Sequence, residues 1–183
     1  MRRLAVVGLV GLVGLVGLPA CERPYLTWTP REPLSARHGR VAVAVDDRRA
    51  DRALLGHAFG WGGAPREILA DRDHARARVE RLTKEALVTA GVGLFTPGEP
   101  PTARLAVEID AMACEGLGRA ARADVALRLT VRAADGTARL AAQAIAARGE
   151  GRGCQAAFEK ALDEVLDELG ARFVEGATHE ALL

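Results

Sequence analysis

Alternation of apolar and polar residues predicts four β-strands in this chain. It is clearest over 121–133, where every second residue is apolar and most residues between them are charged or carry a hydroxyl. A period of two is typical of a strand with one buried face. The same pattern runs over 40–46 and 104–113, and more weakly, because of its alanines, over 139–147. Ala134-Asp135-Gly136-Thr137 then predicts a hairpin turn between the last two strands.

Two further segments repeat their apolar residues at helical spacing. The first begins after Asp71 or Asp73, either of which can cap a helix, and ends near Ala90. The second covers about 155–175. Their expected buried faces are Ala75, Val79, Leu82, Ala86 and Leu87 in the first helix, and Phe158, Ala161, Leu162, Val165, Leu169 and Phe173 in the second.

The order of these elements is strand, helix, three strands, helix. It predicts an α+β fold, in which an antiparallel four-stranded sheet carries both helices on one face. The opposite face of the sheet bears charged residues such as Glu108, Asp110 and Arg128, so we expect it to meet water or a partner.

Residues 1–20 predict an export signal. Arg2 and Arg3 precede an apolar run, 4–18, that is shorter than the ~20 residues needed to cross a bilayer. Leu18-Pro19-Ala20-Cys21 resembles the lipobox of bacterial lipoproteins, which implies cleavage before Cys21 and attachment of lipid, with acyl chains such as palmitate, to that residue. Pro19 departs from the small or hydroxyl residue usual there, and an uncleaved signal anchor is the alternative. By resemblance to enterobacterial sorting, Glu22 implies the outer membrane, facing the periplasm.

Residues 21–39 predict an extended tether, because three prolines interrupt a stretch without hydrophobic period. Tyr25 and Trp28 would lie either at the lipid headgroups or against the domain. The α/β domain would then occupy 40–177, and 178–183 would form a short tail. A chain of 183 residues has room for one such domain.

Charge and the spacing of polar residues exclude several functions. Arg2 and Arg3 lie before Cys21, so the rest of the chain carries 23 basic and 24 acidic side chains, too balanced to attract nucleic acid. The four histidines lie in different segments without metal-ligand spacing, so no metal or cofactor is predicted. No nucleophile and base stand in a recognisable catalytic pattern. The sequence therefore predicts a binding or structural module, not an enzyme.

Cys114 and Cys154 remain as an even pair once Cys21 is assigned to lipid. In the predicted topology both lie at one end of the sheet, beside the start of the second helix. An oxidising compartment favours a disulfide between them. The alternative is two thiols too far apart to join.

Two surface segments are candidates for partner binding. Asp46, Arg48 and Asp51 follow the first strand, where a turn with local ion pairs is the favoured interpretation over a binding patch. Phe59 and Trp61 lie in the glycine-rich stretch 56–63, which is either a binding loop or, as we favour, an ordinary surface loop.

Several of these features resemble the YajG-like lipoproteins of bacteria. They are the run Val41–Arg48, Leu55-Gly56, the helix after Ile68, the strand around Ala123–Val131, and Ala161, Val165 and Leu166 in the final helix. The likeness covers most of 41–169 and implies an envelope location and a small α/β fold, but no activity.

A similar element order occurs in lipopolysaccharide-assembly and transport-system lipoproteins. An accessory lipoprotein of a lipid or lipopolysaccharide transport complex is therefore the alternative function, with an envelope protein or transport complex as partner; the oligomeric state stays open.

Overall fold

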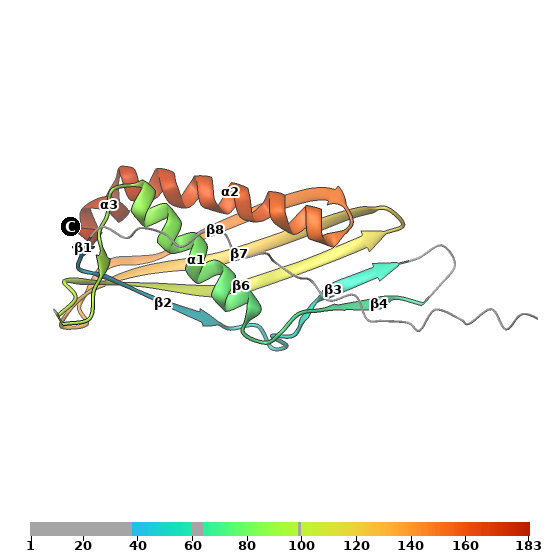
Figure 1. Cartoon of the computed structure of the whole chain (residues 1–183), viewed down its shortest axis with the longest axis horizontal. Coiled ribbons are helices and arrows are strands. Elements are labelled where there is room, and N and C mark those ends of the chain that lie inside the picture. The colour runs from blue at the N-terminus through green and yellow to red at the C-terminus, as the bar shows by residue number, and fades with distance from the viewer. Residues whose placement is uncertain (1–37, 60–63, 99) are drawn as a thin grey trace, which may run out of the picture.

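The computed structural model describes residues 38–59, 64–98 and 100–183, which form one mixed sheet with helices on one face (Figure 1). The strands are β1 (His38–Gly39), β2 (Val41–Asp47), β3 (Leu54–Phe59), β4 (Arg66–Leu69), β5 (Leu94–Phe95), β6 (Ala103–Leu117), β7 (Ala120–Ala133) and β8 (Ala138–Arg152). The helices are α1 (His74–Thr89), α2 (Cys154–Val174) and α3 (Ala177–Leu182). Within these described ranges, no helix is long and apolar enough to cross a membrane.

The sheet is built around β6. On one side, β7 and β8 continue it as an antiparallel meander. On the other side, β2 lies parallel to the first half of β6 and β3 lies parallel to its second half, with β4 antiparallel to β3. The fold class α+β is confirmed, but the prediction of a purely antiparallel four-stranded sheet is wrong. The chain between β2 and β6 passes through α1, and a crossover of that kind returns the next strand in the same direction.

The beginning of the glycine-rich stretch is a strand instead of a loop. Gly56 has φ +134°, and a Cβ atom there would lie 1.9 Å from the carbonyl oxygen of Cys114. Only glycine therefore allows β3 to pair with β6 at this position, in the register Gly56 to Cys114 and Phe59 to Leu117. The glycines that favoured a loop in the sequence instead permit a close approach between strands.

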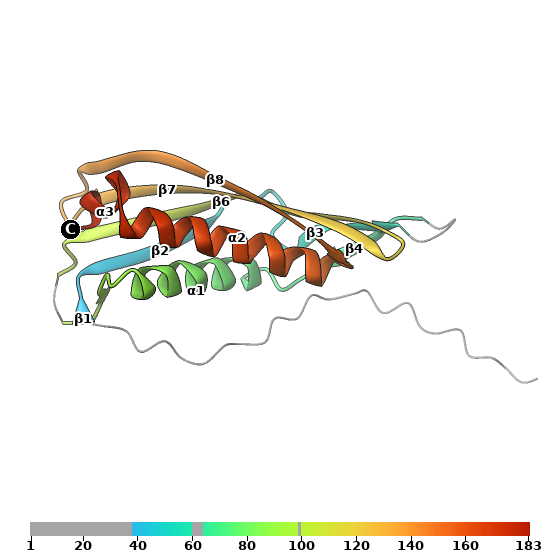
Figure 2. The ribbon, with the colours of Figure 1, turned by 90° about the horizontal axis from the view of Figure 1, so that it is seen from above.

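The helices pack on the sheet as their apolar periods predict. Figure 2 shows α1 and α2 side by side above the strands. Every residue of the two expected helical faces is buried. At Gly149 of β8, a Cβ atom would lie 2.0 Å from the carbonyl oxygen of Ala157, so the backbone of α2 rests directly on that strand. Residues 178–183, expected as a tail, mostly belong to α3, where Ala181 and Leu182 are buried.

Candidate functional site: the open face of the sheet

The face of the sheet opposite α1 and α2, here called the open face, carries side chains in cross-strand rows. Residues such as Arg104 and Glu108 point there because the residues beside them in β6 are buried under the helices. From the β1 end outward, the strand register aligns Ala42, Arg104 and Arg132; then Asp46, Glu108 and Arg128; then Ala113, Asp124 and Arg148; then Glu115, Arg122 and Glu150; and finally Phe59, Leu117, Ala120 and Arg152.

The middle rows are held by ion pairs between neighbouring strands. Arg128 Nη2 lies 2.9 Å from a carboxylate oxygen of Asp110, and Arg148 Nε lies 2.7 Å from one of Asp124. The hydrogen bond from Arg148 lowers the pKa of the Asp124 carboxyl. All these side chains remain partly exposed, so each pair contributes little to stability. This part of the open face is balanced in charge.

The predicted surface residues Asp46 and Arg48 belong to these middle rows. The Arg48 guanidinium lies 3.5 Å from a carboxylate oxygen of Asp46 and also contacts Glu108. Asp51 accepts hydrogen bonds from the backbone N–H groups of Ala53 and Leu54. The structure thus places Asp46 and Arg48 in local ion pairs at the end of β2, and Asp51 in the turn that leads to β3.

An ion pair that the sequence interpretation missed lies directly beneath them. Asp47 is 1% exposed, and its two carboxylate oxygens accept hydrogen bonds from Arg49 Nε at 2.9 Å and Nη2 at 2.7 Å. Arg49 also donates to the carbonyl oxygens of Arg52, Leu54 and Met112. The alternation in β2 contained the signal, because Asp47 falls on the same face as Val41 and Val45, where an acid needs a buried partner.

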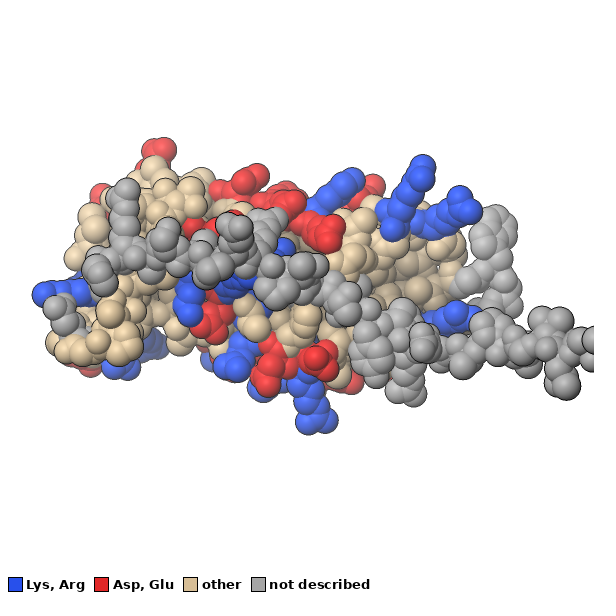
Figure 3. All heavy atoms as spheres, viewed as in Figure 1, with Lys and Arg blue, Asp and Glu red and all other residues tan. Residues whose placement is uncertain are grey.

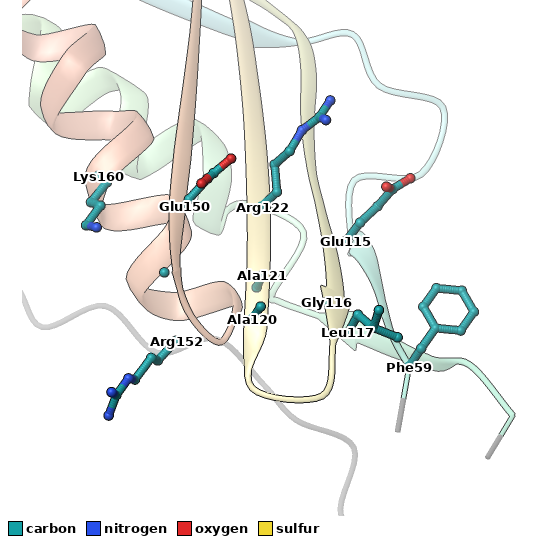
Figure 4. Close-up of a pocket in the computed structure, with 11 residues that line it drawn as sticks. Phe59, Glu115, Gly116, Leu117, Ala120, Ala121, Arg122, Glu150, Arg152 and Lys160 are labelled. Carbon is teal, nitrogen blue, oxygen red and sulfur yellow. The ribbon is translucent and has the colours of Figure 1, made fainter. Parts of the chain in front are cut away.

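The far end of the sheet is hollowed and partly apolar, with lining residues from the open face and from α2. Phe59 is 42% exposed and Leu117 is 74% exposed, in adjacent strands at the same register. With Glu115, Gly116, Ala120, Ala121, Arg122, Glu150, Gly151, Arg152 and Lys160 they line a hollow of about 720 Å³, here called the tip hollow. Figure 4 shows Phe59 and Leu117 on one side of it and Arg152 and Lys160 on the other.

The predicted site residues do not form one cluster. Asp46 and Arg48 lie at the middle of the open face, whereas Phe59 lies at the tip hollow. Trp61, and Cys21 with its predicted lipid, are outside the described residues. Among the residues that the structure does describe, no group of three or more His, Cys, Asp or Glu side chains is placed to hold a metal ion.

The disulfide prediction is confirmed. Cys114 and Cys154 are bonded, with their Cα atoms 5.9 Å apart. The bond joins the second half of β6 to the first residue of α2, close to the tip hollow. It therefore attaches the helical layer to the sheet at the end where the hollow is formed.

Comparison with known proteins identifies the fold but no family. No family model matches the chain, and no curated protein matches its sequence. Protein XCC0632 from Xanthomonas campestris, described under family model DUF330, matches with TM-score 0.55 and 16% identity over 82% of this chain and 92% of that chain. A PelC dodecamer from Paraburkholderia phytofirmans gives TM-score 0.47 and 13% identity over 75% and 88%. The first match shows a shared fold, the second is too distant to support an argument, and the YajG-like resemblance stays a hypothesis.

Proposed function

We propose that this protein is a lipid-anchored lipoprotein of the bacterial envelope whose domain binds a partner and catalyses no reaction. The basic start, the apolar run and the lipobox-like ending at Cys21 support the anchor. Glu22 favours the outer membrane, with the domain in the periplasm. The disulfide between Cys114 and Cys154 is in keeping with an oxidising compartment of that kind.

The observation that carries a binding role is the tip hollow. Large apolar side chains that lie exposed next to each other on a protein surface often mark a binding site. Phe59 and Leu117 do so, and Arg122 and Arg152 lie in the same hollow. Exposed apolar area beside arginine is typical of protein interfaces, so we propose an envelope protein as the partner at this position.

The same lining favours a second candidate, an accessory lipoprotein of a lipid or lipopolysaccharide transport complex. A hollow with apolar residues on one side and Arg152 and Lys160 on the other matches an amphiphile that has acyl chains and an acidic headgroup. In that case the partner would be one defined membrane complex, and the hollow would lie on the path of its lipid.

The anchor can be tested by labelling cells with radioactive palmitate. We expect label on the wild-type protein and none on Cys21→Ser, because acyl transfer requires that thiol. The Cys114→Ser/Cys154→Ser variant is the matched control and should remain labelled. Label that persists on Cys21→Ser would contradict the lipid-anchor assignment.

The tip hollow can be tested with a photoreactive amino acid at Leu117 of the full-length protein in cells. We expect one discrete crosslinked product that weakens several-fold with Phe59→Ala, since the two side chains share the hollow. Ala44, exposed in β2 on the same face, is the control position and should give no such product. Identification of a transport subunit in the product would favour the second candidate. Equal crosslinking from both positions would contradict binding at the tip.

A further inference from the structure

Two arginines face one another at the β1 end of the open face. Arg104 of β6 and Arg132 of β7 are direct partners in the antiparallel register, and both are exposed. Cβ atoms of such partners lie about 4.5–5.5 Å apart, close enough for the two guanidinium groups to share one ligand. Like charges placed directly opposite each other destabilise a sheet, so the pair is not explained by the stability of the fold.

No acid compensates this pair among the residues that the structure describes. The ion pairs of the open face involve Glu108, Asp110 and Asp124, which lie in rows farther along β6 and β7. Within the described ranges, the one hydrogen bond of the Arg132 side chain runs from Nη1 to the carbonyl oxygen of Gly136, in the adjoining turn. Since a guanidinium carries five donors, most of the donors of both arginines are available to an anion.

The pair lies at the end where the chain enters the domain. Arg104 is the direct neighbour of Ala42 in β2, four residues after His38, where the described chain begins. Figures 1 and 2 place β1 at the opposite end of the sheet from β3 and β4, and Figure 3 shows basic side chains at both ends. Cys21 is 17 residues before His38, a span of at most about 60 Å. Of the two ends, this one is closer along the chain to the proposed anchor.

We propose that Arg104 and Arg132 form a binding site for the phosphate groups of anionic phospholipids, which docks this end of the domain on the membrane surface. The proposal rests on the proposed lipid anchor, because the anchor is what brings this end of the sheet near the membrane. Its chemistry depends only on two paired guanidinium groups, which bind phosphate oxygens through parallel hydrogen bonds. Docking here would direct the tip hollow, at the far end of the sheet, away from the bilayer.

The test measures sedimentation of the mature chain, residues 21–183 with Cys21→Ser, with phospholipid vesicles. Without acyl groups, binding reports the arginines alone, while palmitate labelling reports the anchor separately. We expect binding to vesicles of phosphatidylcholine with phosphatidylglycerol, and much weaker binding to phosphatidylcholine alone. Arg104→Gln/Arg132→Gln should weaken binding roughly 30-fold, the equivalent of about 1 kcal/mol for each arginine near an anionic surface.

Arg66→Gln/Arg119→Gln is the matched control, because both arginines are exposed at the far end of the sheet, outside the tip hollow, and the variant removes the same charge. It should leave vesicle affinity unchanged. The melting temperature of Arg104→Gln/Arg132→Gln should be unchanged or higher, because the variant removes a like-charge contact. Equal losses in both double variants, equal binding to both vesicle types, or no binding would overturn the proposal. Free phosphate could also compete with the vesicles for binding, at an ionic strength where chloride does not reduce vesicle binding. That result would assign the arginine pair to a soluble ligand and overturn membrane docking.

Discussion

Asp47→Ala is expected to lower the free energy of unfolding by about 3–5 kcal/mol, because it leaves the guanidinium of Arg49 buried without its counterion. The Arg49 side chain is 7% exposed, so water cannot replace the two lost hydrogen bonds. The same guanidinium donates to carbonyl oxygens of Leu54 and Met112. It therefore joins the end of β2, the turn into β3, and β6 just beyond the irregularity in its pairing with β7.

Urea unfolding followed by circular dichroism would measure this loss, and the neighbouring acid provides the control. Asp46→Ala removes an exposed carboxylate that also pairs with an arginine, and it should cost no more than about 1 kcal/mol. Replacing both buried partners, in Asp47→Ala/Arg49→Met, should recover part of the loss because no charge then stays unpaired. Similar costs for Asp46→Ala and Asp47→Ala would show that the buried ion pair has no special role.

Removal of the disulfide, in Cys114→Ala/Cys154→Ala, is expected to lower the free energy of unfolding by about 4 kcal/mol in the chain-entropy model. The bond closes a loop with a sequence separation of 40 residues, which contains all of β7 and β8. Without it, the unfolded chain gains the freedom that the loop had removed. The separation of β6 from the start of α2 would also become easier, next to the tip hollow.

Denaturation with and without a reducing agent would measure this contribution. Reduced wild-type protein should unfold at a lower urea concentration, close to that of the double variant. The double variant itself should be insensitive to the reducing agent, which excludes an effect of the reagent on the rest of the molecule. A wild-type protein with the same unfolding midpoint under both conditions would contradict a stabilising disulfide.

The elements that the sequence predicted correctly depend on local periodicity. The burial of Val79, Leu82, Phe158 and Leu169 follows from helical spacing of apolar residues, since each helix has one stripe to cover. The alternation in β6 and β7 likewise predicted which residues face the core. The disulfide could also be predicted from the order of the strands, because the directions of three consecutive strands place Cys114 and Cys154 at one end of the sheet.

Other features depend on segments that meet only in three dimensions. The glycines near 56–63 indicated a loop, but Gly56 lies in a strand because its missing Cβ makes room for the Cys114 carbonyl group. The direction of β2 relative to β6 could not be inferred from either strand alone, since parallel and antiparallel strands show the same alternation when one face is buried. For the Asp47–Arg49 pair, the alternation in β2 already placed Asp47 on the buried face, but the partners of Arg49 became visible only in the fold, where it also donates to the carbonyl oxygen of Met112 in β6.

The sequence by itself determined the core faces of both helices, the strands of the meander and the cysteine pairing, because each is encoded in neighbouring residues or in their period. The lipoprotein-like start, outside the described residues, stays a prediction. The tertiary structure alone decided the mixed sheet, the buried Asp47–Arg49 pair, the tip hollow and the row that sets Arg104 opposite Arg132. Each of these depends on strand register, which sets what lies across from a residue. Register depends on the buried face of both strands in a pair and on the turn that joins them, so neither strand alone carries that information.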